Sequence, residues 1–293
     1  MELPPYVVLE KAVGETPLAC METWRKLSGV AADIPLTYAG RLDPMASGKL
    51  LVLVGEECKK KDRYLALDKT YEFSVLLGIG SDTHDVLGRL QTDPFLQSRT
   101  PFEAALGAAR PRFTTPERVL DLETQLRGIC QNLTGEVELP YPHFSSKTVQ
   151  GKPLHMWTLE GRLTEIDIPT KKSTIYSLKL NGMETCARSD LAQVALEKIN
   201  TIPEVTDTSK TLGNDFRRED VRKDWDNIKN NNLPTSDVGK LLLPDAYTIA
   251  HFTCSASSGT YMRTLAKLIG ERLDPAVPSL AWSIHRTEIR GIG

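Results

Sequence analysis

The carboxylate of Asp43 occupies the most constrained setting in this chain. It lies in the run TYAGRLDPMASGKLLVLVG, from Thr37 to Gly55. Two glycines bracket a turn there, Pro44 denies Asp43 the α-helical region, and the apolar residues 50–54 then predict a buried strand. A carboxylate on a stiff loop beside a sheet can act as a nucleophile or a general base. Turn chemistry alone also places Asp in such loops, so the rest of the chain must decide.

Two other motifs supply an aromatic ring and a guanidinium. Tyr71 opens YEFSVLLG, whose alternation predicts a half-buried strand beginning at Tyr71. In SGTYMRTLAKLIGERL, from Ser258, apolar residues recur at helical spacing and put Arg263 in the first turn of a helix. Taken alone, Tyr71 fits simple core packing and Arg263 fits a surface helix.

Further patterns predict the elements that position these residues. Helices are expected from Pro17, with Thr16 as N-cap and Gly29 as stop, and from Thr115 and Pro116 to Gly135; strands are expected at 174–180 and 247–256. The second helix has its apolar face at Val119, Leu122, Leu126, Ile129 and Leu133. Strands and helices mix without a βαβ rhythm, so we expect an α+β fold with a largely antiparallel sheet flanked by helices and loops.

The segment at about 184–245 differs from its surroundings. It is polar and charge-mixed, and it predicts a helix on either side of Pro203. We interpret it as a helical insertion in one catalytic domain that spans residues 1–293. If the segment is helical, its basic side chains would face one another or RNA; they are Arg217, Arg218, Arg222 and Lys223. Neighbouring acids weaken the case for RNA, so a solvated helix is favoured.

Composition indicates an ordinary globular protein. The chain has 293 residues, 40% of them hydrophobic, and a formal net charge of −2, so a polyanion would have to be held by local patches. Its five cysteines are scattered and form no C-x-x-C pair, which argues against a disulfide framework and against a zinc site. No export signal or apolar run of membrane-spanning length is evident, and we expect a cytoplasmic protein.

Three segments, in order, resemble the TruB family of tRNA pseudouridine synthases. They are GRLDP at 40–44, KTY at 69–71 with LGIGSDTHDVLG at 77–88, and SGTYMRT at 258–264. The first segment alone also resembles the RsuA and RluA families of pseudouridine synthases. The second and third segments distinguish the TruB family from those two. The resemblance runs from Val7 to the C-terminus apart from the insertion, and it implies a pseudouridine synthase fold.

The resemblance implies a catalytic set of Asp43, Tyr71 and Arg263. Asp43 would act on the uridine, and Tyr71 would stack on the base that is flipped out of its RNA. A closed pocket would raise the pKa of the carboxylate, so Arg263 is expected to pair with Asp43 and keep it charged. No cofactor and no metal are implied. Whether Asp43 attacks the sugar, attacks the base or removes a sugar proton stays open.

The resemblance also implies RNA-binding or base-binding residues. These are Lys11, Tyr38, Asp85, Lys147, Tyr261 and Ile284. Tyr38 stands where the family usually carries His, and Ala12 replaces the proline that usually follows Lys11. A plain turn carboxylate is the alternative for Asp85, and a solvated lysine is the alternative for Lys11.

The resemblance implies a protein that binds the T arm of tRNA and converts the uridine at position 55. We expect it to act as a monomer. The chain ends at IRGIG, so we expect no C-terminal PUA domain. Phosphate contacts are expected from loop and strand cations, namely Lys59, Lys60, Lys61, Arg63, Lys152, Lys171 and Lys172. The alternatives are a synthase for another RNA and a non-catalytic protein that binds RNA or folds tRNA on the same scaffold.

Overall fold

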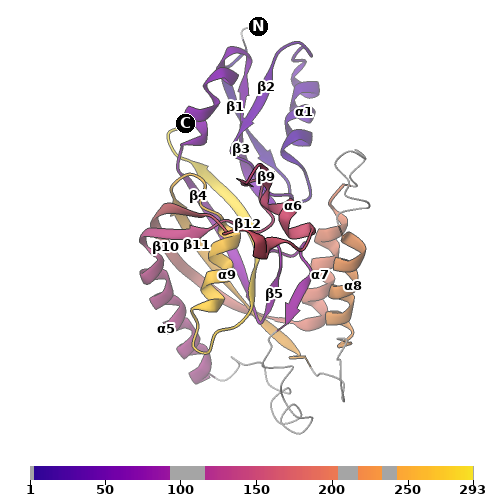
Figure 1. Cartoon of the computed structure of the whole chain (residues 1–293), viewed down its shortest axis with the longest axis vertical. Coiled ribbons are helices and arrows are strands. Elements are labelled where there is room, and N and C mark those ends of the chain that lie inside the picture. Colours follow the sequence, from indigo (N-terminus) through magenta and orange to yellow (C-terminus); the bar gives the residue numbers. More distant parts are fainter. Residues whose placement is uncertain (1–2, 93–115, 204–216, 233–242, 293) are drawn as a thin grey trace.

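A long, mostly antiparallel sheet runs through the protein (Figure 1). The computed structural model describes residues 3–92, 116–203, 217–232 and 243–292. In these residues eight strands form one sheet in the order β1-β3-β12-β4-β11-β10-β7, with β2 also paired to β3. The strands are β1 (Tyr6–Lys11), β2 (Leu36–Ala39), β3 (Ala46–Val54), β4 (Lys69–Leu77), β7 (Gly135–Pro140), β10 (Thr170–Ala187), β11 (Ala246–Ala256) and β12 (Ser279–Ile289). The predicted α+β class with a largely antiparallel sheet is confirmed; the parallel contact is that of β12 with the start of β3.

Helices cover both faces of the central strands β4, β11 and β12. On one face, α5 (Pro116–Leu133) and α9 (Met262–Glu271) share a core with Phe73 and Phe252. On the other, α7 (Arg188–Asn200) and α8 (Arg218–Lys229) pack around Leu76 and Trp282. Figure 1 shows these two helix pairs on opposite sides of the sheet. The sheet is therefore the middle layer of this part of the molecule.

An N-terminal lobe extends the sheet beyond these layers. Strands β1, β2 and β3 carry α1 (Pro17–Ser28) on one face and η1 (Gly55–Lys60) with α2 (Lys61–Leu65) on the other. The loop that carries Asp43 lies between β2 and β3, where this lobe meets the rest of the sheet. Small elements complete the fold: β5 (Ile79–Ser81), β6 (Leu90–Thr92), β8 (Thr148–Val149), β9 (Lys152–Pro153), α6 (Leu154–Leu159) and η2 (Leu163–Glu165).

Local capping chemistry sets the ends of α1. Thr16 Oγ1 accepts a hydrogen bond from the Ala19 N–H at 3.1 Å, and Pro17 occupies the first helical position. Gly29 ends the helix in the left-handed region, at φ 65°. These features match the helix predicted from Thr16 to Gly29.

Strand β4 differs from its prediction. It begins at Lys69, not Tyr71, and residues 73–77 are all buried. The alternation suggested a half-buried strand, but β4 lies between β11 and β12 and supplies side chains to both cores. Ser74 is accommodated because its Oγ lies 2.5 Å from Ser283 Oγ on the neighbouring strand.

The remaining predicted elements are present with changed bounds. Helix α5 packs with Leu122, Leu126 and Leu133 inward, but Val119 is 38% exposed and stands off the apolar face. Strands β10 and β11 stay paired up to Ala187 and Ala246, so residues 184–187 belong to the sheet. Helices α7 and α8 lie on either side of Pro203, as predicted. Thr115 lies outside the described residues.

All five cysteines are free thiols. In the ranges that the structure describes, no helix combines the length and apolar character that crossing a membrane requires.

Candidate active site

Hydrogen bonds from three directions hold the loop of Asp43. Arg286 of β12 donates from Nε to Lys49 O at 2.6 Å and from Nη2 to Gly40 O at 3.1 Å, so it ties the two sides of the loop together. The Gly14 N–H donates to Pro44 O at 2.9 Å. Within the loop, Ala46 N–H donates to Asp43 O at 2.9 Å. The backbone of Asp43 is thus fixed before any ligand arrives.

Gly48 does not end the turn, as its spacing from Gly40 suggested. It lies inside β3 rather than at the end of the turn, with φ at 100°. A Cβ at this position would lie 2.8 Å from Arg286 N, so only glycine lets β12 approach β3 here. This close approach sets Arg286 beneath the Asp43 loop.

The structure brings Arg263 and Asp43 together. Arg263 is 4% exposed, and its Nε donates to Asp43 Oδ2 at 2.8 Å. Its Nη1 donates to Thr83 O at 2.8 Å and its Nη2 to Phe144 O at 3.2 Å. Burial lowers the pKa of Arg263, but Asp43 and Asp85 raise it, and the net direction is upward. The guanidinium is therefore charged and fixed in orientation.

The Asp43 side chain remains partly open. It is 38% exposed, whereas Arg263 beside it is nearly enclosed. Within the described part of the chain, the hydrogen bond to this carboxylate comes from Arg263 and engages Oδ2. The other oxygen, Oδ1, is left for a reacting group.

Asp85 places a second carboxylate near Arg263. Its Oδ2 lies 3.8 Å from Arg263 Nε, and its Oδ1 accepts from Thr83 Oγ1 at 2.6 Å and from the Leu87 N–H at 3.0 Å. Burial raises its pKa, while Arg263 opposes that rise, and the net direction is upward. Asp85 is therefore more than a solvated turn residue, and its contacts are with protein groups.

Tyr71 lies beside Arg286 in the sheet. The two residues are register partners in β4 and β12, so the Arg286 guanidinium lies close to the Tyr71 phenol. Burial raises the pKa of the Tyr71 phenol, and Arg286 partly offsets that rise. The charge of Asp43 also raises it, so the phenol lies within electrostatic reach of the carboxylate.

Two further predicted site residues adjoin this group. Tyr261 immediately precedes α9 and packs edge-on against Tyr141, with ring centroids 5.8 Å apart. Burial raises the pKa of Tyr261, as does the nearby charge of Asp43. Ile284 is 8% exposed and lies between Ala46 and Phe73 in register, so it presents an apolar wall next to the Asp43 loop.

Lys11 is a buried bracing residue. It is 0% exposed, and its Nζ donates to Ala12 O at 2.8 Å and to Glu15 O at 2.7 Å. It thereby closes the loop whose Gly14 N–H holds Pro44 O. Burial lowers the pKa of Lys11 to about 8, although nearby acids oppose this. The alternative of a solvated lysine is wrong.

Tyr38 and Lys147 make local contacts. The Tyr38 ring packs on the α1 side of the N-terminal lobe, and Lys61 Nζ lies 5.6 Å from its centroid. Lys147 Nζ lies 5.3 Å from the Tyr141 ring, which itself packs on Tyr261. Lys147 is therefore linked to Tyr261 through the ring of Tyr141. Tyr38 belongs to the separate apolar cluster under α1.

The cations predicted to bind phosphate are largely paired within the protein. Lys59 and Lys60 bond Glu56 and Glu57, and Lys61 bonds Thr37. Lys152 pairs with Glu160, and Lys171 bonds Ser258 O. In α8 and the residue before it, Arg217, Arg218 and Arg222 bond Asp82, Ile202 and Asn200. The favoured solvated helix is wrong for one face of α8, which buries Arg218 with Val221, Trp225 and Ile228.

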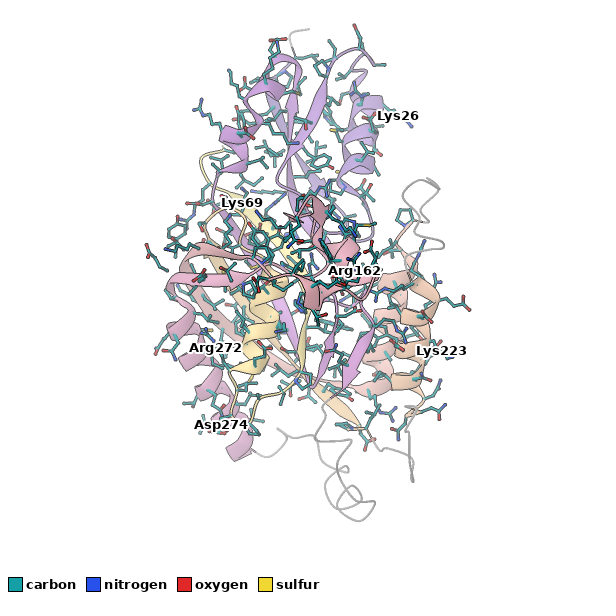
Figure 2. All side chains as sticks on the ribbon, viewed as in Figure 1. Lys26, Lys69, Arg162, Lys223, Arg272 and Asp274 are labelled. Atoms are coloured by element: carbon teal, nitrogen blue, oxygen red, sulfur yellow. The ribbon has the colours of Figure 1, made fainter. Side chains whose placement is uncertain are left out.

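Sequence reasoning missed Arg286 and Lys69. Both are buried, and both lie under Gly40 at the junction where Figure 2 labels Lys69. Lys69 Nζ donates to Leu65 O at 3.0 Å, and burial lowers its pKa to about 8. One signal was available: Arg286 follows Ile284 by two residues, so a strand puts both on the same face.

In residues 3–92, 116–203, 217–232 and 243–292, no group of three or more His, Cys, Asp or Glu side chains is arranged to hold a metal ion.

Comparison with known proteins identifies relatives of this chain. Residues 35–116 match the model of the TruB family pseudouridylate synthase N-terminal domain. The tRNA pseudouridine synthase B of Caldicellulosiruptor saccharolyticus is 31% identical over 59% of this chain and 50% of its own length. That of Aromatoleum aromaticum is 34% identical over 61% of this chain and 49% of its own. The chain spans about half the length of these curated relatives.

A solved Cbf5-Nop10-Gar1 complex aligns with 97% of this chain and 48% of the matched chain, at a TM-score of 0.48 and 13% identity. The family match includes the GRLDP and SDTHD motifs, which supply Asp43 and Asp85 to the site described above. Residues 35–116 of this chain are thus similar to the N-terminal domain of TruB family pseudouridylate synthases.

Proposed function

We propose that this protein is a tRNA pseudouridine synthase that isomerises the uridine at position 55 of the T loop, with Asp43 as the reacting carboxylate. The observation that carries the proposal is the pair of Asp43 and Arg263. A fixed, charged guanidinium engages one carboxylate oxygen while the side chain stays 38% exposed. A carboxylate held in this way is ready to act on a bound nucleotide.

The reaction fits a site built from a carboxylate, a phenol and apolar walls. The N1–C1′ glycosidic bond of uridine breaks, the base turns, and a C5–C1′ bond forms. The hydrogen on C5 leaves as a proton and N1 gains one, so there is no net redox change and no hydrolysis. Proton movement and covalent assistance are tasks for side chains. We assign the step on the nucleotide to Asp43 Oδ1, because Oδ2 accepts from Arg263.

Base binding falls to the groups around the carboxylate. A target uridine must leave its stack to reach Asp43, and a flipped base needs a flat partner and an apolar wall. Tyr71 offers the ring, and Ile284 offers the wall beside the Asp43 loop. Tyr261 adds a second aromatic surface near the same charge.

The substrate assignment rests on the family. The relatives compared above are named tRNA pseudouridine synthase B. The T-loop position is what the motif resemblance implies. RNA loops are recognised by shape and by splayed, stacked bases. The same proposal treats residues 1–293 as one catalytic domain, acting as a monomer, with an insertion between β10 and β11.

A tritium-release assay tests the proposal. Purified protein is incubated with a tRNA transcript that carries 5-tritiated uridine, because forming the C5–C1′ bond expels the label to water. Nucleoside chromatography of the same RNA identifies pseudouridine. We expect one tritium per tRNA and none from a transcript with U55→C. Equal release from both transcripts would refute the T-loop assignment, and absence of release from any RNA would refute the activity.

A further inference from the structure

Helix α8 holds one turn of the candidate active site from outside. The turn is residues 81–90, which we call the Asp85 turn, and it links β5 to β6. We propose that α8 braces this turn and that Arg217, the residue that precedes the helix, is a positioning residue for Arg263 and Asp43. This inference rests on the proposed function, since it concerns how those two side chains are held for catalysis.

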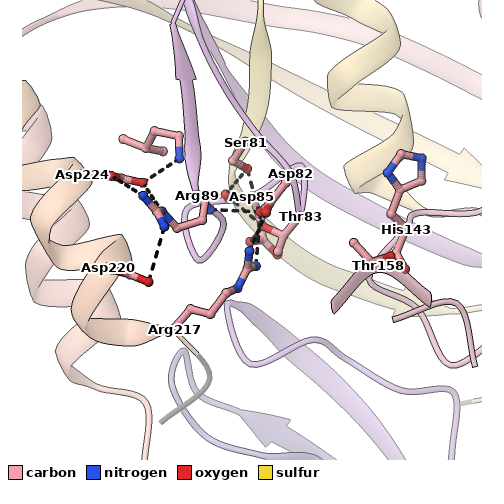
Figure 3. A network of polar contacts seen from close by, with 11 residues as sticks. Ser81, Asp82, Thr83, Asp85, Arg89, His143, Thr158, Arg217, Asp220 and Asp224 are labelled. Atoms are coloured by element: carbon pink, nitrogen blue, oxygen red, sulfur yellow. Dashed lines mark hydrogen bonds and ion pairs between the residues drawn. The ribbon is translucent and has the colours of Figure 1, made fainter. Parts of the chain in front are cut away.

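One half of the brace lies at the end of the Asp85 turn. Arg89 Nε pairs with Asp224 Oδ2 at 2.7 Å, and the same oxygen accepts the Leu90 N–H at 3.1 Å. Arg89 Nη1 also lies 3.4 Å from Asp220 Oδ2. Figure 3 shows both acids of α8 pointing at Arg89. Helix α8 thus fixes the point at which the turn enters β6.

Trp225 joins α8 to the middle of the same turn. Its side chain is fully buried, and its Nε1 donates to Val86 O at 3.0 Å. The side chains of Val86 and Trp225 also belong to one apolar cluster. Apolar packing sets the separation of the two elements, and this directional bond adds a fixed contact next to Asp85.

Arg217 forms the other half, at the start of the turn. Its Nη1 and Nη2 lie 2.6 Å and 3.3 Å from the two oxygens of Asp82, which makes the pair bidentate. The two side chains are 23% and 25% exposed, so the pair is more shielded from water than an ordinary surface pair. Arg217 Cζ also lies 4.6 Å from the centroid of the Phe144 ring.

These contacts lie next to both carbonyls that orient Arg263. Thr83 O, one residue after Asp82, accepts from Arg263 Nη1, and Phe144 O accepts from Nη2. Arg217 therefore contacts Asp82, the residue before Thr83, and the ring of Phe144 itself, so it supports both backbone groups that aim the guanidinium at Asp43. A shift of either carbonyl changes where the Arg263 Nε–H points, and small misalignments of reacting groups are costly.

Enzyme kinetics of single and double variants test the brace. Arg217→Met removes the pair and the cation over Phe144, and we expect kcat for pseudouridine formation to fall about tenfold with KM for tRNA within threefold of wild type. Arg217→Lys keeps a charge opposite Asp82 and should recover part of the loss. Lys229→Met is the matched control, because Lys229 lies on the same helix and bonds Gln193 of α7 instead of the turn. It should leave kcat unchanged.

Asp82→Asn completes a double-mutant cycle with Arg217→Met. In the wild type, the Arg89 N–H donates to Asp82 Oδ1 at 2.9 Å. The Asn side chain keeps an oxygen that can accept this bond, but it removes the negative charge that pairs with Arg217. This variant should lose no more activity than Arg217→Met, and the double variant should lose no more than Arg217→Met alone. Additive losses, or an equal loss in Lys229→Met, would overturn the proposal, since they would indicate general destabilisation.

Amide hydrogen exchange gives a readout that needs no activity. The Leu87 N–H donates to Asp85 Oδ1, and the Ala281 N–H donates to His84 O at 2.9 Å, so both report on the turn. We expect both amides to exchange faster in Arg217→Met and at the wild-type rate in Lys229→Met. Unchanged exchange in Arg217→Met would overturn the brace. A wild type inactive on every RNA would refute the proposed function instead, and exchange alone would then decide the brace.

Discussion

Arg263 Nε lies 2.8 Å from Asp43 Oδ2, although 220 positions separate the two residues in the chain. The guanidinium divides its other donors between Thr83 O and Phe144 O, which lie on two further segments. Four distant parts of the sequence therefore meet at one buried cation. The planar guanidinium has N–H donors pointing in several fixed directions, so one side chain can bond all three acceptors.

Arg263→Lys tests the need for that fork. A lysine keeps the charge but cannot donate in three fixed directions, so we expect kcat to fall about 100-fold or more. Because the site is buried, we also expect the free energy of unfolding to drop by about 3 kcal/mol. Arg272→Lys, at the exposed end of α9 (Figure 2), is the control and should change neither quantity. An Arg263→Lys enzyme with more than half of wild-type kcat would contradict this account.

The phenol and the ring of Tyr71 can be separated by substitution. Tyr71→Phe keeps the ring, whereas Tyr71→Leu removes it, and base stacking on an aromatic ring contributes about 1–3 kcal/mol. We therefore expect Tyr71→Leu to be roughly 5- to 150-fold less active than Tyr71→Phe in single-turnover assays. Tyr176→Phe, on the exposed part of β10, serves as control. Equal activities of the Phe and Leu variants would show that the ring does not stack on the base.

The pH dependence of the reaction bears on the same residue. Burial raises the pKa of Tyr71 above its usual value of 10. The phenol is then protonated at and below pH 10, and kcat of the wild type should show no falling limb from Tyr71 in that range. Comparison of the pH profiles of wild type and Tyr71→Phe measures this. A falling limb below pH 10 that disappears in Tyr71→Phe would contradict it.

Gly48 is predicted to be irreplaceable for packing. A Cβ there would lie 2.8 Å from Arg286 N, and φ is 100°, so Gly48→Ala should reduce the free energy of unfolding by about 3 kcal/mol. Gly55 also has a positive φ, but a Cβ there meets nothing within 4 Å. Gly55→Ala should therefore cost only about 1 kcal/mol. Urea unfolding of both variants gives the comparison, and equal losses would refute the close approach of β3 and β12.

Lys11 should make stability depend on pH. Burial lowers its pKa from 10.5 to about 8, so between these values the unfolded chain binds more protons than the folded one. Stability then rises with pH as the folded lysine loses its proton. Relative to Lys11→Met, the wild type should gain about 1 kcal/mol between pH 7 and pH 9.

Urea unfolding at the two pH values measures the Lys11 effect. Taking the difference between wild type and variant cancels groups that titrate alike in both proteins. Lys26→Met, on the exposed side of α1 (Figure 2), should show the wild-type pH dependence. Parallel curves for wild type and Lys11→Met would mean that the ammonium is not desolvated in the folded protein.

Local features of the fold were predictable from the sequence. Thr16, Pro17 and Gly29 define α1 because each acts within one or two turns of its own position. The position of Arg263 at the start of α9 followed from helical spacing in the same way. The partnership of Arg263 with Asp43 did not follow from either pattern. It came from the family resemblance, since no local rule links residues so far apart.

Buried polar residues account for most of what the sequence did not reveal. Arg286 and Lys11 read as ordinary charged residues, yet both are enclosed and hold backbone carbonyls around the Asp43 loop. Ser74 made β4 look half-exposed, because its partner Ser283 lies on another strand. Arg217 looked like part of a solvated helix, because Asp82 lies 135 positions away. In each case the partner that stabilises the buried group is distant in sequence.

The most direct test of the account is single-turnover pseudouridine formation by Asp43→Asn, with tRNA binding measured on the same preparation. Asparagine is close in size and can still accept a hydrogen bond from Arg263, so the Kd for tRNA should stay within a few fold of wild type. The rate should fall by at least about 1,000-fold, because an amide is neither a nucleophile nor a base here. Asp33→Asn, an exposed acid near β2, is the control and should retain full activity. An Asp43→Asn protein that still forms pseudouridine at a tenth of the wild-type rate would contradict the role given to Asp43.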